Sequence, residues 1–88
     1  MRNQTEITAL RKRVATNIKR LRTSRNWPQE KLGEHASLSQ VYLSRIENAR
    51  VACTVDTLAA IAAAMQIDPV ELVSNPDISQ YQTSHETN

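Results

Sequence analysis

Six side chains between residues 39 and 48 have the types and spacing needed to contact DNA bases from one helical face. Gln40 can pair bidentately with adenine N6 and N7, Arg45 can pair with guanine O6 and N7, and Val41 can contact a thymine methyl. Arg45 could instead contact a phosphate or form a surface ion pair. The outward-facing side chains are Ser39, Gln40, Val41, Ser44, Arg45 and Asn48, and the first five of them are predicted to read bases in the major groove.

The segment that must position these side chains, residues 28–50, predicts two short helices joined by a tight turn. Its apolar residues repeat with helical spacing but lose phase near Ser37. A helix-turn-helix requires this break, because its turn swings the chain by roughly 90 to 120° within about 3 to 4 residues. Gly33 keeps the first helix small where the second crosses it. The apolar residues are Leu32, Ala36, Leu38, Leu43 and Ile46.

Three further helices are predicted around this pair. A long first helix over residues 6–25 follows from apolar residues three or four apart, with Asn26 as a left-handed stop. A later helix has Thr54 as its N-cap and Asp56 in its first turn. A short last helix begins at Asp68-Pro69. The expected buried residues are Ile7, Leu10, Val14, Ile18 and Leu21 in the first helix, and Leu58, Ile61, Ala62 and Met65 in the later one.

Residues 14–73 resemble the Cro/C1-type (Xre-like) helix-turn-helix domain of phage repressors, restriction-modification controller proteins and small bacterial regulators. The resemblance implies an all-α fold, a five-helix lambda-repressor-like DNA-binding domain. Residues 1–13 extend its first helix as an arm, a dimer contact or a frayed end. Residues 74–88 form a polar, mobile tail, unless Ile78 and Tyr81 dock on the last helix or a partner subunit. The matching motifs are Ile18-x-x-Leu21-Arg22, Trp27-x-Gln29-x-x-Leu32, Tyr42-Leu43-Ser44-Arg45-Ile46-Glu47 and Thr57-Leu58-x-x-Ile61-Ala62.

The resemblance also implies roles outside the base-reading face. Gln29 matches the position whose amide meets a phosphate at a helix N-terminus. Arg50 and Tyr42 are further phosphate candidates, although Tyr42 could simply pack beside the preceding helix. Arg22 and Glu47 match an internal ion pair, which is a structural role.

Three positions depart from the family pattern. Ser37 stands where glycine is usual in the turn, which should cost some stability. Pro28 replaces a Ser or Thr N-cap and leaves the first amides of its helix without a side-chain acceptor. Where relatives have glycine, Asn48 or Ala49 must end the second helix of the helix-turn-helix, the one that carries the base-reading residues. Asn48 either ends this helix or contacts a phosphate.

Charge is distributed unevenly along the 88 residues. Residues 1–53 hold all 11 Lys and Arg against four acids, a net charge of +7, whereas residues 54–88 hold five acids and no Lys or Arg. A polyanion should therefore meet the first part, although an ordinary solvated surface could carry the same charges.

Enzyme, metal and membrane functions are not expected. No catalytic constellation comes together on so small a helical frame. The single Cys53 is expected to be an inert small residue rather than a redox sensor, and with only His35 and His85 beside it a zinc site lacks ligands. No cofactor and no membrane span are expected, and the cytoplasm of a bacterium or phage host, near the nucleoid, is the expected compartment.

The function expected from these features is a sequence-specific regulator of transcription that binds double-stranded DNA. One such domain offers few base contacts, so a homodimer on a pseudo-palindromic operator is expected, formed through the last two helices, with the tail as an additional candidate contact. The activity of such a regulator would depend on the concentration of the protein and on its dimer equilibrium. Its own promoter is one expected site of action. The alternative is an antitoxin that binds a toxin through the segment from Ser74. RNA polymerase is another possible protein partner, and a pure protein-interaction module would not need Gln40 and Arg45.

Overall fold

Five α-helices and no strand make up residues 4–76, the part of the chain that the computed structural model describes. The expected all-α, five-helix architecture is confirmed. The first helix begins two residues before its predicted start and ends one residue before its predicted end. The helices are α1 (Gln4–Ser24), α2 (Gln29–Ala36), α3 (Gln40–Glu47), α4 (Val55–Met65) and α5 (Val70–Val73).

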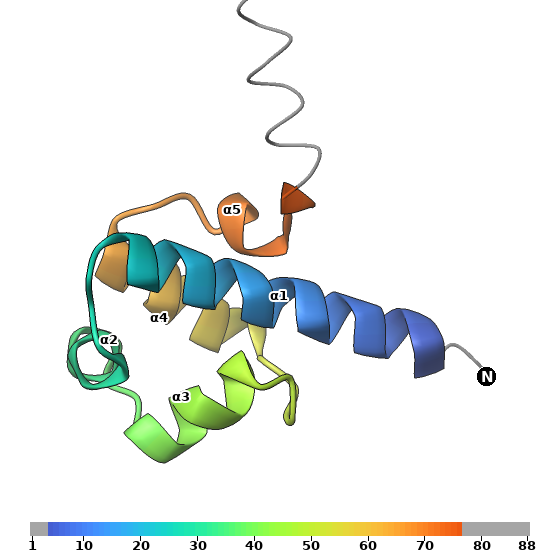
Figure 1. Cartoon of the computed structure of the whole chain (residues 1–88), viewed down its shortest axis with the longest axis horizontal. Helices are drawn as coiled ribbons and strands as arrows, with labels where there is room; N and C mark the ends of the chain where they lie inside the picture. The colour runs from blue at the N-terminus through green and yellow to red at the C-terminus, as the bar shows by residue number, and fades with distance from the viewer. Residues whose placement is uncertain (1–3, 77–88) are drawn as a thin grey trace, which may run out of the picture.

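The core lies where the carboxyl-terminal half of α1 meets the other helices. α1 packs against α3 and α5, and α2 packs against α3 and α4. In Figure 1, α1 spans the width of the molecule, and its amino-terminal part extends past the other four helices. The predicted inward residues are buried in α2, α3 and α4, except that Leu58 is only half-buried. The apolar side chains that are fully buried are Ile18, Leu32, Leu43, Ile61 and Leu72, joined by Ile46 at 2% exposure.

The first two residues of the predicted α1 stripe are not part of this core. Ile7 is 47% exposed and Leu10 is 49% exposed, because α1 has already left the other helices at that point. The helical spacing of these residues was predicted correctly, but their burial was not. Their apolar side chains therefore remain available on the surface.

Four residues with left-handed backbone lie just beyond the ends of helices α1 to α4. They are Asn26 (φ 58°), Ser37 (φ 59°), Ala49 (φ 59°) and Gln66 (φ 58°). The left-handed backbone expected at Asn26 and at Ser37 is confirmed. At the end of α3, Asn48 is the capping residue, but Ala49 adopts the positive φ. Only Asn tolerates this conformation readily, so the other three residues store strain.

Gly33 is required by the turn between α2 and α3. A Cβ atom at this position would lie 2.7 Å from the backbone carbonyl oxygen of Leu38. That same turn is closed by the Leu38 amide, which donates to the Gly33 carbonyl at 2.8 Å. The small residue at position 33 is therefore needed by the turn backbone at Leu38, whereas the sequence predicted that the crossing of the second helix requires it.

The helix starts follow the predicted capping chemistry. Pro28 precedes α2 without a side-chain cap, whereas the Thr54 hydroxyl accepts a hydrogen bond from the Thr57 amide at the start of α4. The Asp68 carboxylate accepts from the Val70 amide at 2.9 Å and so begins α5.

The short helix α5 is tied to α1 by Asn17, which the apolar pattern did not identify. Asn17 is fully buried, and its Nδ2 donates to the Leu72 and Ser74 carbonyl oxygens at 3.0 and 2.8 Å. These carbonyls belong to the end of a helix, where no backbone donor is available. Asn17 thus satisfies the end of α5 from inside the core.

Several expectations concern features that the described residues either lack or do not include. Within residues 4–76, no helix is long and apolar enough to cross a membrane, and no three His, Cys, Asp or Glu residues gather as a metal site. The expectations for Ile78, Tyr81 and His85 lie outside the described residues, as does most of the segment on which the antitoxin hypothesis depends.

Candidate DNA-binding surface

The recognition helix α3 has one face in the core and one in solvent. Leu43, Ile46 and Glu47 are buried, whereas Gln40, Val41 and Arg45 are exposed. Residues three or four apart share a helical face, so residues 40, 41, 44, 45 and 48 form one outward strip. The structure therefore brings together four of the five residues predicted to read bases, and the fifth, Ser39, directly precedes the helix.

The exposed part of this strip is free to bind a ligand. Among residues 4–76, the side chains of Gln40 and Arg45 have no hydrogen-bond or ion-pair partner. Val41 is 66% exposed and is one of only five large apolar side chains in this part of the chain that remain in solvent. An amide, a guanidinium and an apolar side chain thus project from neighbouring positions of one helix. This combination matches the donor, acceptor and methyl pattern of the major groove.

The other residues of the predicted set also have roles in holding α3. The Ser39 hydroxyl accepts a hydrogen bond from the Tyr42 amide at 3.1 Å and is the N-cap of α3. Asn48 Nδ2 donates to the Ser44 carbonyl oxygen at 2.8 Å, which stabilises the other end of the helix. Capping by Ser39 was not predicted, although serine before a helix is its usual signal.

A buried ion pair fixes α3 to the rest of the domain. Arg22 of α1 donates from Nε and Nη2 to the two carboxylate oxygens of Glu47, at 2.7 and 2.9 Å. The side chains are 9% and 3% exposed. Arg22 Nη1 donates to the Trp27 carbonyl oxygen at 2.6 Å, a contact that the sequence did not suggest. The ion pair implied by the family resemblance is therefore present, and it also holds the connection between α1 and α2.

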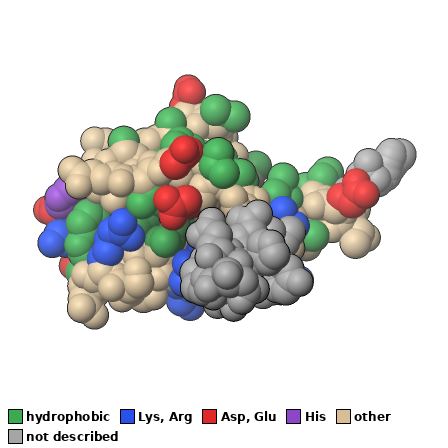
Figure 2. Space-filling model, turned by 90° about the horizontal axis from the view of Figure 1, so that it is seen from above, with side chains coloured by type: hydrophobic (Ala, Val, Ile, Leu, Met, Phe, Trp, Pro, Cys, Tyr) green, Lys and Arg blue, Asp and Glu red, His purple; other side chains and the backbone are tan. Residues whose placement is uncertain are grey.

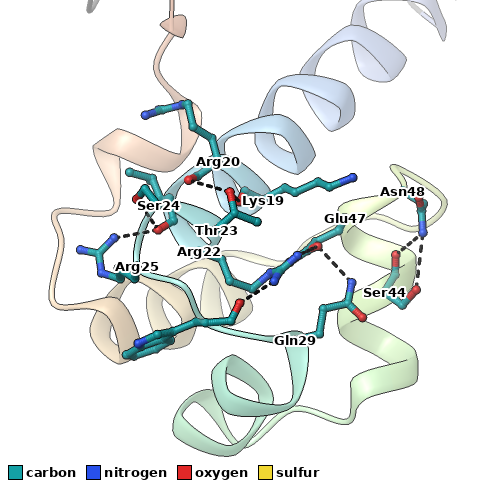
Figure 3. A network of polar contacts seen from close by, with 12 residues as sticks. Lys19, Arg20, Arg22, Thr23, Ser24, Arg25, Gln29, Ser44, Glu47 and Asn48 are labelled. Carbon is teal, nitrogen blue, oxygen red and sulfur yellow. Dashed lines mark hydrogen bonds and ion pairs between the residues drawn. The ribbon is translucent and has the colours of Figure 1, made fainter.

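Gln29 extends this cluster to the start of α2. Its Nε2 donates to Glu47 Oε1 at 3.0 Å, so Arg22, Glu47 and Gln29 meet where α1, α2 and α3 converge (Figure 3). An amide nitrogen carries two protons, and this bond uses one of them. The Gln29 side chain is thus held in place at a helix N-terminus with a second donor still available.

The first turn of α2 offers backbone donors beside Gln29. Pro28 provides no side-chain cap, and the first hydrogen bonds of the helix begin with the Lys31 and Leu32 amides, which donate to the Pro28 carbonyl oxygen. The amides of residues 29 and 30 precede this point and have no partner inside the helix. A helix N-terminus with free amides attracts an anion such as a phosphate.

Two further phosphate candidates occupy different environments. Tyr42 is partly buried against the core, and its hydroxyl lies 3.4 Å from Thr57 Oγ1 of α4. The packing alternative for Tyr42 placed it beside the preceding helix, but its polar contact is with α4. Arg50 is exposed just past α3, and its guanidinium has no partner among the described residues.

The comparisons with known proteins agree with this geometry. A helix-turn-helix family model matches residues 18–72. The chain is 38% identical over 74 residues to an uncharacterised HTH-type transcriptional regulator of Sinorhizobium fredii, which covers 84% of this chain and 96% of that protein. Among solved structures, a hypothetical transcription factor, NHTF, from Neisseria is similar with a TM-score of 0.80 and 26% identity, over 83% of this chain and 84% of that one. The restriction-modification controller protein C.AhdI from Aeromonas hydrophila is similar with a TM-score of 0.71 and 25% identity, over 73% and 97% of the two chains.

Proposed function

Since the chain belongs to the helix-turn-helix family of Cro/C1-type transcriptional regulators, which are DNA-binding proteins and not enzymes, we propose that it binds a pseudo-palindromic operator as a homodimer. In this proposal α3 enters the major groove of each half-site. The observation that carries it is the outward strip of α3, where Gln40, Val41 and Arg45 are exposed and have no other polar partner among the described residues.

Base reading is assigned to the outward strip of α3. Gln40 pairs with adenine, Arg45 with guanine, and Val41 contacts a thymine methyl, while Ser39 and Ser44 adapt to neighbouring edges. Each bidentate pair contributes roughly 1 to 3 kcal/mol of discrimination, which corresponds to about 5- to 150-fold in affinity between the right and the wrong base.

Phosphate binding is assigned to the two ends of the helix-turn-helix. At one end, the remaining amide proton of Gln29 and the free amides of α2 meet one phosphate. At the other end, Arg50 and Asn48 meet another, and Tyr42 contributes from beside α4. These contacts set the register of α3 on the duplex and carry no sequence information themselves.

The homodimer is supported by the apolar surface outside the DNA-binding face. Apart from Val41, the exposed large apolar side chains of the described residues lie on α1, α4 and α5; they are Ile7, Leu10, Val55 and Val70. Contiguous exposed apolar surface marks protein interfaces, and Ile7 and Leu10, three residues apart, share one face of α1. A two-fold dimer sets its two recognition helices about 34 Å apart on one side of the DNA. Acting in the cytoplasm at its own promoter, such a dimer would link operator occupancy to the concentration of the protein.

Selection of bound duplexes from a random DNA library tests the proposal. At about physiological salt, the wild-type protein should enrich a motif with two inverted half-sites whose centres lie about 10 to 10.5 base pairs apart, or a multiple of that spacing. A non-palindromic motif would overturn the homodimer. Failure to enrich any motif would overturn sequence-specific binding.

A further inference from the structure

The amino-terminal part of α1 forms one wall of an apolar groove on the side of the molecule. We call residues 4–13 the arm. The groove has a volume of about 240 Å³. On the arm side it is lined by Ile7 and Leu10, and on the opposite side by Val51 and Cys53 of the loop between α3 and α4. Leu58 of α4 and Val73 of α5 also line it, and Arg11 is its one charged lining residue.

The arm makes few contacts with its own domain: Arg13 Nη1 donates to the Val73 carbonyl oxygen at 3.4 Å, and Ile7, Leu10 and Arg11 line the groove. All its residues are exposed except Arg11, which is partly buried. In Figure 2, which looks from the α5 side, hydrophobic side chains lie along the projecting arm and on the body next to it. The match to the helix-turn-helix family begins only at residue 18, so the arm is a feature of this chain outside the matched domain.

The same chain thus presents an apolar ridge and an apolar groove side by side. In a two-fold dimer the same patch contacts itself, so ridge and groove must complement each other on one surface. We propose that the groove is filled by the arm of a second copy of this chain, each copy inserting Ile7 and Leu10 into the groove of the other. This inference rests on the homodimer proposed above and specifies its surface.

Charge favours a second copy as the occupant. The arm ends in three consecutive cations, Arg11, Lys12 and Arg13. The described residues from 54 onward, which include α4 and α5, carry the acids Asp56, Asp68 and Glu71 and no Lys or Arg. An arm that crosses to the partner therefore brings Arg11 and Lys12, which have no ion-pair partner among the described residues, toward an acidic part of the other copy. Such complementarity favours the correct partner over wrong ones.

Cys53 provides a direct test, because it lines the groove and is the only cysteine in the chain. A tagged Ile7→Cys/Cys53→Ser chain is mixed with an untagged wild-type chain and treated with bismaleimidoethane. Any link between position 7 and Cys53 must then join two different chains. The expected product is a cross-linked heterodimer, identified by mass and peptide mapping.

The matched control is Thr8→Cys/Cys53→Ser. Thr8 is the next residue of the arm and faces a separate shallow hollow lined by Gln4 and Thr5. This variant should give at least about 10-fold less cross-linking. Equal cross-linking from positions 7 and 8 would show random collision and overturn the inference.

Sedimentation equilibrium measures the contribution of the arm. Leu10→Ser removes an apolar side chain from each half of the interface and should raise the dimer dissociation constant at least about 10-fold. Val41→Ser, at an exposed apolar position on the DNA face, should leave it unchanged. Melting followed by circular dichroism confirms that both variants fold.

The remaining outcomes separate this inference from the proposed function. A wild-type dimer that neither cross-links from position 7 nor weakens in Leu10→Ser would overturn the arm exchange and leave the homodimer in place. A wild-type monomer at all concentrations would overturn both, while the DNA selection would still report on base reading. If Cys53 is alkylated at the same rate in the monomer as in the dimer, the partner's arm does not cover the groove and the inference is wrong.

Discussion

Glu47 is the residue whose loss should damage this domain most without touching DNA. Its carboxylate accepts three hydrogen bonds, two from Arg22 and one from Gln29. Glu47→Ala removes all three and leaves the Arg22 guanidinium buried, with only the Trp27 carbonyl oxygen as a partner. Breaking one side of a buried ion pair typically costs about 3 to 5 kcal/mol, because the remaining charge is uncompensated.

That loss is large compared with the stability of a chain this size. At roughly 0.05 to 0.15 kcal/mol per residue, a domain of this length is stable by about 4 to 13 kcal/mol. Each kcal/mol corresponds to about 4 to 8 °C in Tm for a domain this small. Glu47→Ala should therefore lower the Tm by more than about 10 °C and weaken DNA binding through unfolding.

Urea denaturation followed by circular dichroism at 222 nm gives the free energy of unfolding for wild type and variant. Gln29→Ala is the matched control, because it removes one hydrogen bond of the same cluster and no charge; it should cost only about 0.5 to 1.5 kcal/mol. The double variant Arg22→Met/Glu47→Leu should recover most of the stability lost in Glu47→Ala, since it leaves no buried charge. A cost below about 1 kcal/mol for Glu47→Ala would show that the pair does not hold the fold. Loss of binding by a fully folded Glu47→Ala variant, with binding kept in Gln29→Ala, would place Glu47 at the DNA.

Three further outcomes follow from local features. Ser37→Gly should stabilise the domain by about 0.5 to 1 kcal/mol in urea denaturation, because Ser37 has φ 59° and is exposed; a destabilised variant would contradict the strain at the turn. Asn17→Ala should lower the free energy of unfolding by about 1 to 3 kcal/mol and speed hydrogen exchange of the α5 amides, since two carbonyl oxygens lose their buried donor. Unchanged hydrogen exchange in α5 would contradict this role of Asn17. Burial raises the pKa of the Cys53 thiol above its ordinary value. Iodoacetamide should therefore react with Cys53 more slowly than with a free cysteine at pH 8, and the pH dependence of this reaction rate should be shifted to higher pH. A shift to lower pH would instead indicate an activated thiol.

Local patterns in the sequence predicted the features that depend on nearby residues. The helical repeats, the N-cap at Thr54 and the left-handed residues Asn26 and Ser37 each follow from neighbours within one or two turns. The pairing of Arg22 with Glu47 came from the family resemblance, since 25 positions separate the two residues and no local pattern joins them.

The features that were missed depend on contacts between distant segments. Asn17 lies on the buried side of α1 and bonds residues 55 and 57 positions away, so its role emerges only when α5 is in place. A polar residue within an apolar stripe was the available signal. The contact of Tyr42 with Thr57 was missed for the same reason, since it depends on how α4 packs. Ile7 and Leu10 continue the helical spacing, but spacing alone does not show where a helix leaves the core.

Base-specific binding by α3 can be tested most directly by repeating the duplex selection with Gln40→Ala and Arg50→Ala at the same salt concentration. Gln40→Ala should relax the preference at one adenine position in each half-site and leave the other positions selective. Arg50→Ala, which loses only a phosphate contact, should bind more weakly but keep the wild-type motif. An unchanged motif in Gln40→Ala would contradict the assignment of Gln40 as a base-reading residue of α3.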